Sequence, residues 1–589
     1  MSWIPDSLTV LSEQWSGILR LLAPFGIGGL LTFGLLRRLL RDHFDTTETF
    51  LLALAGWPLW WVLSALVGFF INRHLDFGPG WAAFILSVSG LLLLPGWKKM
   101  SAPLGRFSWL LLALVLAFLL SLVTRLAFLA NLLVPSYFDG ALHYKISQHL
   151  LTHFGQWPWD ASPPLVNGYY HIGFHLLTAS TAFVTNLEAA QVILILGQFT
   201  LAVLPFPVFL VTKRETGSAL AAFFALILAG WGWNMPAHAL NWGKYPALAG
   251  LLALQFALSL AFSSTRAVFS PRKKVALLAL FAIGTAVSAL MHTRSLVVIF
   301  IFIFGYFAAL YWGRLPNRGK WAMFALLLAG LAGLVIYIES RSILNLVFDP
   351  YLRAGLWISL LVAALSPFAF RRFERLSLTS LTALFLLLAC LLLPLPGEAF
   401  QTPLDRPFVQ MTLYLPLAML GGLGLAGLRA ESFRAWQIAL ITVAVFGALF
   451  VHIQREYPFS ASPCCILLKT DDAIAFDWLQ ENLPEDALIL IAGNTLNVFD
   501  IENPAGLRGA DGGIWIPLLT GRQASIEHLG VDFSAEETLD SLCQRDITHV
   551  YLGGAQERFN VAGLQARPEW YARQLTLPGA QVFEVIGCP

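Results

Sequence analysis

Residues 135–175 read PSYFDGALHYKISQHLLTHFGQWPWDASPPLVNGYYHIGFH and form a polar, aromatic island between long hydrophobic segments. The island contains seven side chains that can titrate or bind a metal: Asp139, His143, His149, His153, Asp160, His171 and His175. Charged groups are costly in hydrocarbon, so a chain this apolar needs such an island for aqueous chemistry. We therefore interpret residues 135–175 as the first wall of an active site at a membrane surface, framed by the hydrophobic segments.

The composition is that of a membrane protein. Of the 589 residues, 57% are hydrophobic and 12% are charged, with a mean hydropathy of +0.69. Soluble proteins carry about 25% charged residues. The net charge of +2 gives no indication of a nucleic-acid partner. The first apolar run follows Asp6 and Glu13 instead of a basic region, which favours a retained span over a cleaved signal peptide.

Apolar runs long enough to cross a hydrocarbon core of about 30 Å predict an all-α polytopic fold with about 14 transmembrane helices. The predicted spans are 17–36, 50–71, 81–96, 107–130, 189–211, 218–234, 245–262, 275–291, 296–312, 321–338, 354–370, 378–395, 409–428 and 434–452. A further run, 169–186, is short and contains His171 and His175. If it does not cross, all seven basic clusters between the spans fall on one side, as the positive-inside rule requires, and both termini lie outside.

The loops on the opposite, outer side carry scattered polar residues in place of basic clusters: His238, Asn241, Lys244, His292, Arg294, Glu339, Arg341, Asp349, Arg353, Glu398, Asp405 and Arg406. These groups come from separate loops that can converge on one cavity. The alternative is that each is a lone charge reaching from a span end to the membrane surface.

From about Ile453 the composition changes to that of a small α/β domain. AIAFDWLQENL and ETLDSLCQRD predict helices, whereas ALILIAG, THVYLGG and QVFEVIG predict strands. We therefore divide the chain into a transmembrane domain over 1–452, with a large outer loop over 131–188, and an extracytoplasmic α/β domain over 453–589. Four of the five cysteines lie in the second domain, where one or two disulfides are expected without a defined pairing.

Two histidine-containing patterns in the island are candidate site elements. Asp139 and His143 are four residues apart, so both project from one face of a helix beginning near Gly140. The alternatives are an Asp139 that only caps this helix and a His143 that is an ordinary interfacial residue. His171 and His175 have metal-ligand spacing, but no carboxylate accompanies them as in H-E-x-x-H. We therefore expect this pair to line a polar cavity or to bind a phosphate or sugar.

Three short strings carry a family resemblance: FDGALH (138–143), GYYHIGFH (168–175) and ALNWGKYPALAG (239–250). They resemble a bacterial branch of the GT-C superfamily of membrane glycosyltransferases, whose members show D-G-x-x-H, Y-x-x-G-F-H and N-W-G-[KR]-Y-P. This branch is related to the mannosyltransferase and aminoarabinose-transferase fold. LDRPFVQMTLYLPLAMLGGLGL (404–425) is similar to its late span, and the C-terminal domain to its small extracytoplasmic domain. One departure is that Gly140 stands where a second acidic residue often follows the loop aspartate.

The resemblance implies transfer of a hexose or pentose from a polyprenyl-phosphate donor to a lipid, glycan or protein acceptor. The reaction would take place at the outer face of a bacterial cytoplasmic membrane. Phosphate is a good leaving group, so one carboxylate base suffices, and Asp139 is the candidate. Attack on the anomeric carbon would invert its configuration. Candidate substrate-binding residues are His143, His171, His175, Lys244, His292, Arg294 and Arg406. No residue is assigned as a metal ligand and no cofactor is certain, although a divalent metal, Mg²⁺ or Mn²⁺, is left open.

Three other functions compete with this one. A transporter or flippase would place polar residues at mid-span and commonly shows internal repeats, neither of which is evident. A polymerase or ligase of lipid-linked glycans usually has its large loop late in the chain, whereas here it comes early. A receptor anchored by its spans would not need fourteen of them.

Overall fold

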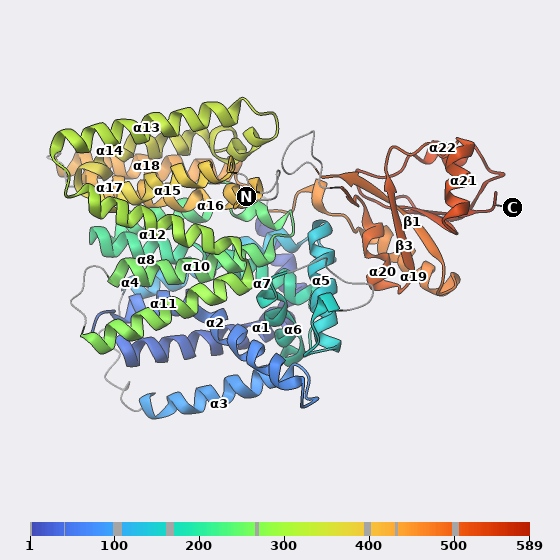
Figure 1. Ribbon diagram of the computed structural model, residues 1–589, viewed down its shortest axis with the longest axis horizontal. Helices are drawn as coiled ribbons and strands as arrows, with labels where there is room; N and C mark the ends of the chain where they lie inside the picture. The colour runs from blue at the N-terminus through green and yellow to red at the C-terminus, as the bar shows by residue number, and fades with distance from the viewer. Residues whose placement is uncertain are drawn as a thin grey trace. The chain divides into compact units, whose positions relative to one another are not determined.

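The computed structural model describes residues 3–40, 42–97, 109–160, 170–264, 270–393, 402–429, 434–496 and 506–588 (Figure 1). The chain divides into two compact units. The first, called the membrane unit, comprises residues 1–127, 146–239 and 245–459. The second, called the sheet unit, comprises residues 128–145, 240–244 and 460–589. Two short pieces of the predicted transmembrane domain, one of them containing Asp139, thus belong to the sheet unit.

The membrane unit is built from helices, most of which have roughly parallel axes in Figure 1. They are α1 (Trp3–Leu40), α2 (Thr46–Asn72), α3 (Gly80–Trp97), α4 (Trp109–Leu126), α6 (Gly173–Thr185), α7 (Ala189–Val203), α8 (Pro205–Thr216), α9 (Ala219–Ile227), α10 (Tyr245–Ser264), α11 (Pro271–Met291), α12 (Arg294–Trp312), α13 (Asn317–Glu339), α14 (Leu356–Arg372), α15 (Glu374–Cys390), α16 (Arg406–Thr412), α17 (Tyr414–Arg429) and α18 (Ala435–Glu456). The division between the units passes through α5 (Tyr137–Thr152).

The predicted polytopic helical architecture is confirmed. Within the described residues, 11 helices are long and apolar enough to cross a membrane, or up to 12 if Leu344–Arg353 and Leu356–Arg372, bent by 79°, count as one span. The other predicted spans coincide with the shorter helices α3 and α15. Positions 107–108 and 394–395 of two predicted spans lie outside the described residues. This is the architecture of a multi-pass membrane protein.

Helix α6 settles the length of the ambiguous run at 169–186. It has 13 residues, which rise about 20 Å at 1.5 Å per residue. That is less than the hydrocarbon thickness of about 30 Å. Asn186, in a left-handed conformation with φ 51°, ends the helix. The length agrees with the interpretation that this segment does not cross the membrane.

The sheet unit contains the predicted α/β structure. Its six-stranded sheet has the order β2-β1-β4-β6-β5, with β3 paired to β1. The strands are β1 (Leu488–Thr495), β2 (Leu507–Gly509), β3 (Gln523–His528), β4 (His549–Leu552), β5 (Tyr571–Thr576) and β6 (Gln581–Val585). The helices are α19 (Thr470–Asn482), α20 (Ile516–Leu519), α21 (Glu536–Gln544) and α22 (Val561–Gln565). Strands β3 and β4 pair with β1 in parallel, while β2 is antiparallel to it.

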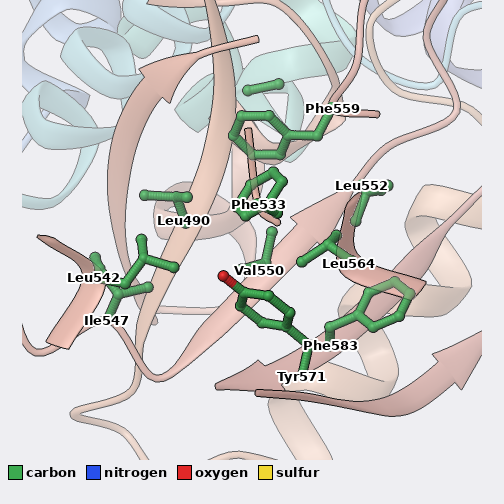
Figure 2. Close-up of a cluster of buried hydrophobic side chains, with 11 residues drawn as sticks. Leu490, Phe533, Leu542, Ile547, Val550, Leu552, Phe559, Leu564, Tyr571 and Phe583 are labelled. Atoms are coloured by element: carbon green, nitrogen blue, oxygen red, sulfur yellow. The ribbon is translucent and has the colours of Figure 1, made fainter. Parts of the chain in front are cut away.

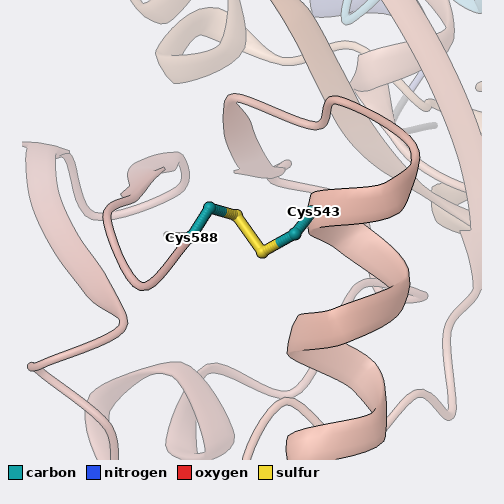
Figure 3. The surroundings of a disulfide bond; sticks show 2 residues. All are labelled: Cys543 and Cys588. Atoms are coloured by element: carbon teal, nitrogen blue, oxygen red, sulfur yellow. A yellow bond between two sulfur atoms is a disulfide. The ribbon is translucent and has the colours of Figure 1, made fainter.

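The sheet unit has its own apolar core, which Figure 2 shows. Its members come from the strands, from α21 and α22 and from the loops between them: Leu490, Ala492, Phe533, Leu542, Ile547, Val550, Leu552, Phe559, Leu564, Tyr571 and Phe583. A disulfide between Cys543 on α21 and Cys588 near the chain end closes a separation of 45 residues (Figure 3). This pairing, left open by the sequence, constrains the unfolded chain.

Glycines let α17 approach α14 closely. A Cβ on Gly427 would lie 2.2 Å from the carbonyl oxygen of Phe368, and one on Gly424 would lie 2.5 Å from that of Leu365. Small residues at such positions allow helix backbones in membranes to come together, where packing replaces the hydrophobic effect as the driving force.

We expect the Gly427→Ala variant to lower the midpoint of thermal unfolding in detergent, because overpacking costs about 1–3 kcal/mol. Gly447→Ala on α18 is the matched control, since a Cβ there meets nothing within 4 Å. Alanine in an open helical site is neutral or stabilising by up to about 1 kcal/mol. Equal midpoints for the two variants would contradict the close approach of α14 and α17.

Candidate functional site

The two motifs that carry Asp139 and Lys244 meet in the sheet unit. Asp139 lies in the first turn of α5, and the Lys244 ammonium forms an ion pair with its carboxylate across 105 residues of chain. The Asp139 side chain is 15% exposed and that of Lys244 is 30% exposed. A half-buried ion pair of this kind is screened less by water than a surface pair. Both side chains are therefore partly accessible to solvent and are paired with each other.

Gly243 makes this meeting sterically possible. Its φ of +67° lies in the left-handed region that favours glycine, and a Cβ on it would lie 2.7 Å from the Gly140 nitrogen. The same Cβ would lie 2.9 Å from the Ser136 carbonyl oxygen. The Ser136 hydroxyl donates a 2.5 Å hydrogen bond to the carbonyl of Leu240. The N-W-G-K segment thus packs backbone to backbone against the start of α5.

Tyr137, two residues before Asp139, has a strained backbone. Its φ is +63°, a conformation that is uncommon for a bulky residue and that clusters at functional sites. Burial is the main cause that raises the pKa of its hydroxyl, and electrostatic interactions with Cys465, Asp139 and Glu557 raise it further. Tyr137 therefore stays a neutral hydrogen-bonding group beside the Asp139 carboxylate.

Adjacent cysteines lie in the same electrostatic environment. Cys464 is exposed and Cys465 is buried, and both interact electrostatically with Tyr137. Hydrogen bonds from the Cys465 thiol and from the Ser462 hydroxyl, whose oxygen is 3.2 Å from the Cys464 sulfur, lower the pKa of Cys464 to about 6. The same interaction with Cys464, together with burial, raises the pKa of Cys465. Sequence reasoning considered these residues only for disulfides and did not connect them with Asp139.

The rest of α5 within the sheet unit is anchored by packing. His143 is 2% exposed, one turn after Asp139, so its ring belongs to the packed interior in this structure. The next residue, Tyr144, contacts the fully buried Trp515 with ring centroids 5.5 Å apart.

Asp511 of the sheet unit is also fully buried and accepts hydrogen bonds from the backbone nitrogens of Gly513 and Gly553. Burial raises the pKa of Asp511 to about 7.

The membrane unit holds a separate cluster of aromatic and histidine rings. The His171 and His292 ring centroids are 4.4 Å apart, and Tyr170 stacks on His171 at 4.1 Å. The ring centroids of His175 and Tyr170 are 5.8 Å apart, and those of His292 and Phe408 are 4.8 Å apart. The predicted pair His171 and His175 is therefore joined by His292 from the end of α11.

Gly173 brings the start of α6 against the end of α11. A Cβ on this residue would lie 2.7 Å from the carbonyl carbon of Leu290. That approach is what places the rings from the island beside His292. In the sequence, the glycine between the two histidines indicates that another segment can approach closely. It does not indicate that this segment is the end of α11.

The predicted arginines of the membrane unit lie near one helix start. Arg294 forms a 2.7 Å ion pair with Asp405, and Asp405 also caps α16 by accepting a 2.9 Å hydrogen bond from the Phe408 nitrogen. Arg406 donates a 3.2 Å hydrogen bond to the carbonyl of Ile343. Sequence reasoning named Asp405 only as one of many outer polar residues and missed its role as the partner of Arg294.

The eight predicted site residues thus form two groups. Three belong to the sheet unit: Asp139, His143 and Lys244. Five belong to the membrane unit: His171, His175, His292, Arg294 and Arg406. Within the described part of the chain, no group of three or more His, Cys, Asp or Glu side chains is arranged to hold a metal ion. Residues 168 and 169 of the GYYHIGFH string lie outside the described residues.

No family model matches this sequence, and neither does any curated protein. Among solved structures, the fold is similar to that of an oligosaccharyltransferase from Archaeoglobus fulgidus, crystallised with zinc and sulfate. The TM-score is 0.37 and the sequence identity is 13%, over 80% of this chain and 72% of that chain. A similarity of this degree carries no conclusion about activity.

The electrostatics around Cys464 predict an unusually reactive thiol. We expect alkylation of Cys464 by iodoacetamide to rise with pH through a midpoint near 6, because the thiolate is the reactive form. Cys465→Ala removes the principal donor to that thiolate, so the midpoint should move up toward the ordinary value of about 8.5. Cys390→Ala is the control and should leave the midpoint unchanged. A wild-type midpoint near 8.5 would show that the described hydrogen bonds do not stabilise the thiolate.

Proposed function

We propose that this chain is a GT-C-like membrane glycosyltransferase that transfers a sugar from a polyprenyl-phosphate donor to a lipid, glycan or protein acceptor. In this proposal residues 1–452 form the membrane-spanning domain, with its large outer loop over 131–188. Residues 453–589 form the α/β domain on the outer face of a bacterial cytoplasmic membrane. The Cys543–Cys588 disulfide supports that side, because disulfides persist in oxidising compartments.

One observation carries the proposal: the ion pair between Asp139 and Lys244. The two residues come from FDGALH and ALNWGKYPALAG, the strings on which the family resemblance rests, and nothing in their spacing along the chain requires contact. A carboxylate beside a cation is what transfer from a phosphate-linked donor needs, because one group takes a proton and the other stabilises the departing phosphate. The strained Tyr137 next to them supports a site instead of a merely structural pair.

The reaction follows from these two charges. The acceptor hydroxyl oxygen attacks the anomeric carbon while its proton passes to the Asp139 carboxylate. The bond between the anomeric carbon and the phosphate oxygen breaks, and the polyprenyl phosphate leaves with that electron pair. The Lys244 ammonium, exchanging Asp139 for the phosphate, stabilises the new negative charge. Attack from the opposite face inverts the anomeric configuration.

The remaining candidates are assigned to substrate binding. Arg294 and Arg406 are proposed to bind a substrate anion within the membrane unit, and a planar guanidinium suits phosphate oxygens. His171, His175 and His292 are proposed to bind a sugar or phosphate within the membrane unit, where His171 is 7% exposed and His175 is fully buried. His143, one turn after Asp139 on α5, is proposed as a further substrate-binding residue. A divalent metal, Mg²⁺ or Mn²⁺, would add Lewis-acid stabilisation of the phosphate. The FDGALH string supplies one carboxylate for such a metal, that of Asp139, because Gly140 stands where a second acidic residue often follows in the family motif.

We expect the Asp139→Asn variant to lower kcat by about 10²- to 10⁴-fold, the usual contribution of general-base catalysis. The assay follows release of polyprenyl phosphate from a panel of polyprenyl-phosphate hexoses and pentoses, with the purified full chain in liposomes containing membrane-extracted acceptors. Asp540→Asn is the matched control, because Asp540 is an exposed aspartate on α21 of the same unit. A well-folded Asp139→Asn protein with wild-type turnover would overturn the assigned role.

Variants of Lys244 should change donor binding and not proton transfer. Hydrogen bonds to charged groups contribute about 1.5–3 kcal/mol, so Lys244→Ala should raise the donor KM by about 10- to 100-fold. Lys244→Arg keeps the cation, matches the K/R alternation of the family motif and should retain a donor KM within a few-fold of wild type. An unchanged KM in Lys244→Ala, or equal losses in both variants, would assign Lys244 to holding α5 in place and not to the donor.

A further inference from the structure

A wide apolar cleft lies within the membrane unit, between α12, α13, α14, α15 and α17. Its volume is about 910 Å³, near the upper end of the usual range for ligand pockets. One wall is formed by Trp321, Phe324 and Leu328 of α13, and the facing wall by Ala363, Pro367 and Phe370 of α14. No residue proposed above for sugar transfer lines it.

The cleft exists because α13 packs loosely. Ile338 is its one buried residue, although the structure describes the whole helix and its composition is strongly apolar. Trp321 is 71% exposed, whereas the floor of the cleft, which includes Leu378 and Leu420, is buried. Apolar walls of this size do not stay empty in a close-packed environment. In a bilayer, lipid acyl chains surround the helices and can fill a cleft that opens to the side.

One end of the cleft is charged. Lys320 and Arg371 line it together with a single carboxylate, Glu374. Glu374 accepts a 2.5 Å hydrogen bond from the Trp312 indole and lies 3.5 Å from the Lys320 ammonium. The lining of this end therefore contains two basic side chains and one carboxylate, a composition that favours an anion over a zwitterion. Four more arginines lie close by in the sequence: Arg314 before α13, Arg318 in its first turn, Arg372 at the end of α14 and Arg375 in the first turn of α15.

We propose that this cleft binds one anionic glycerophospholipid as a bound structural or regulatory lipid. Its phosphate lies beside Lys320 and Arg371, and its acyl chains run between α13 and α14 over Phe324 and Phe370. The charge at the cleft end selects the headgroup. Basic pockets between transmembrane helices on the side that carries the basic loops typically meet anionic lipids. The lipid fills the volume that α13 leaves open and fixes α13 against the bundle.

Native mass spectrometry of the delipidated full chain in detergent tests this proposal. The probes are phosphatidylglycerol and phosphatidylcholine with identical acyl chains, which differ only in headgroup charge. We expect one tightly retained phosphatidylglycerol, preferred over phosphatidylcholine by on the order of tenfold, since each basic residue near a lipid surface contributes measurably. Millimolar inorganic phosphate should not displace it, because the acyl chains hold it in the cleft.

Two variants locate the lipid. Lys320→Ala combined with Arg371→Ala should abolish the preference for phosphatidylglycerol, and Ala363→Phe should reduce retention of both lipids by filling the cleft. Arg314→Ala combined with Arg318→Ala removes equal charge at the start of α13 from residues that do not line the cleft, and it should leave the preference intact.

Several results would overturn the proposal. They are equal retention of the two lipids by the wild-type chain, equal losses in both double variants, displacement by phosphate, preferential retention of a polyprenyl phosphate, or a second copy of the chain in place of a lipid. The wild-type comparison does not depend on any variant folding correctly.

Discussion

Backbone amides and carbonyls cannot be left without hydrogen bonds in hydrocarbon, and the membrane unit follows from that constraint. Helices satisfy every such group internally, so the long apolar runs of this chain can only be helices. Because lipid is as apolar as leucine, the helices associate through packing, and the glycines of α17 allow α14 to approach within backbone contact. Reactive polar chemistry is then confined to helix ends and to the sheet unit.

The Asp139 region shows how such chemistry is held in place. Asp139 stands at the start of a helix whose first turn is fixed by a strained Tyr137, and Gly243 at positive φ brings Lys244 against it. These positions are set by backbone geometry, which is stiffer than contacts between long side chains. Cys464 and Glu557, which are distant from α5 in the sequence, interact electrostatically with Tyr137. The C-terminal part of the chain therefore contributes to the surroundings of Asp139 instead of forming an independent appendage.

Sequence periodicity predicted the elements best where each element carries its own signal. The long helices and the strands at ALILIAG, THVYLGG and QVFEVIG were predicted, because continuous apolar runs and buried strands are local features. Strands β2, β3 and β5 were missed. β2 has three residues, and β3 and β5 are largely exposed, so none shows a distinct pattern of buried residues. The short helix α6 was ambiguous because its composition resembles a span whereas its length does not.

By itself, the sequence determined that this chain is a helical multi-pass membrane protein with a small α/β part, because hydropathy and periodicity are properties of neighbouring residues. It also singled out Asp139 and Lys244 as candidates through short motifs. Only the tertiary structure decided that these two residues touch, that Arg294 pairs with Asp405, and that Cys543 bonds to Cys588. Such contacts depend on where the chain returns in space, and loop closure over tens to hundreds of residues leaves no trace in local composition.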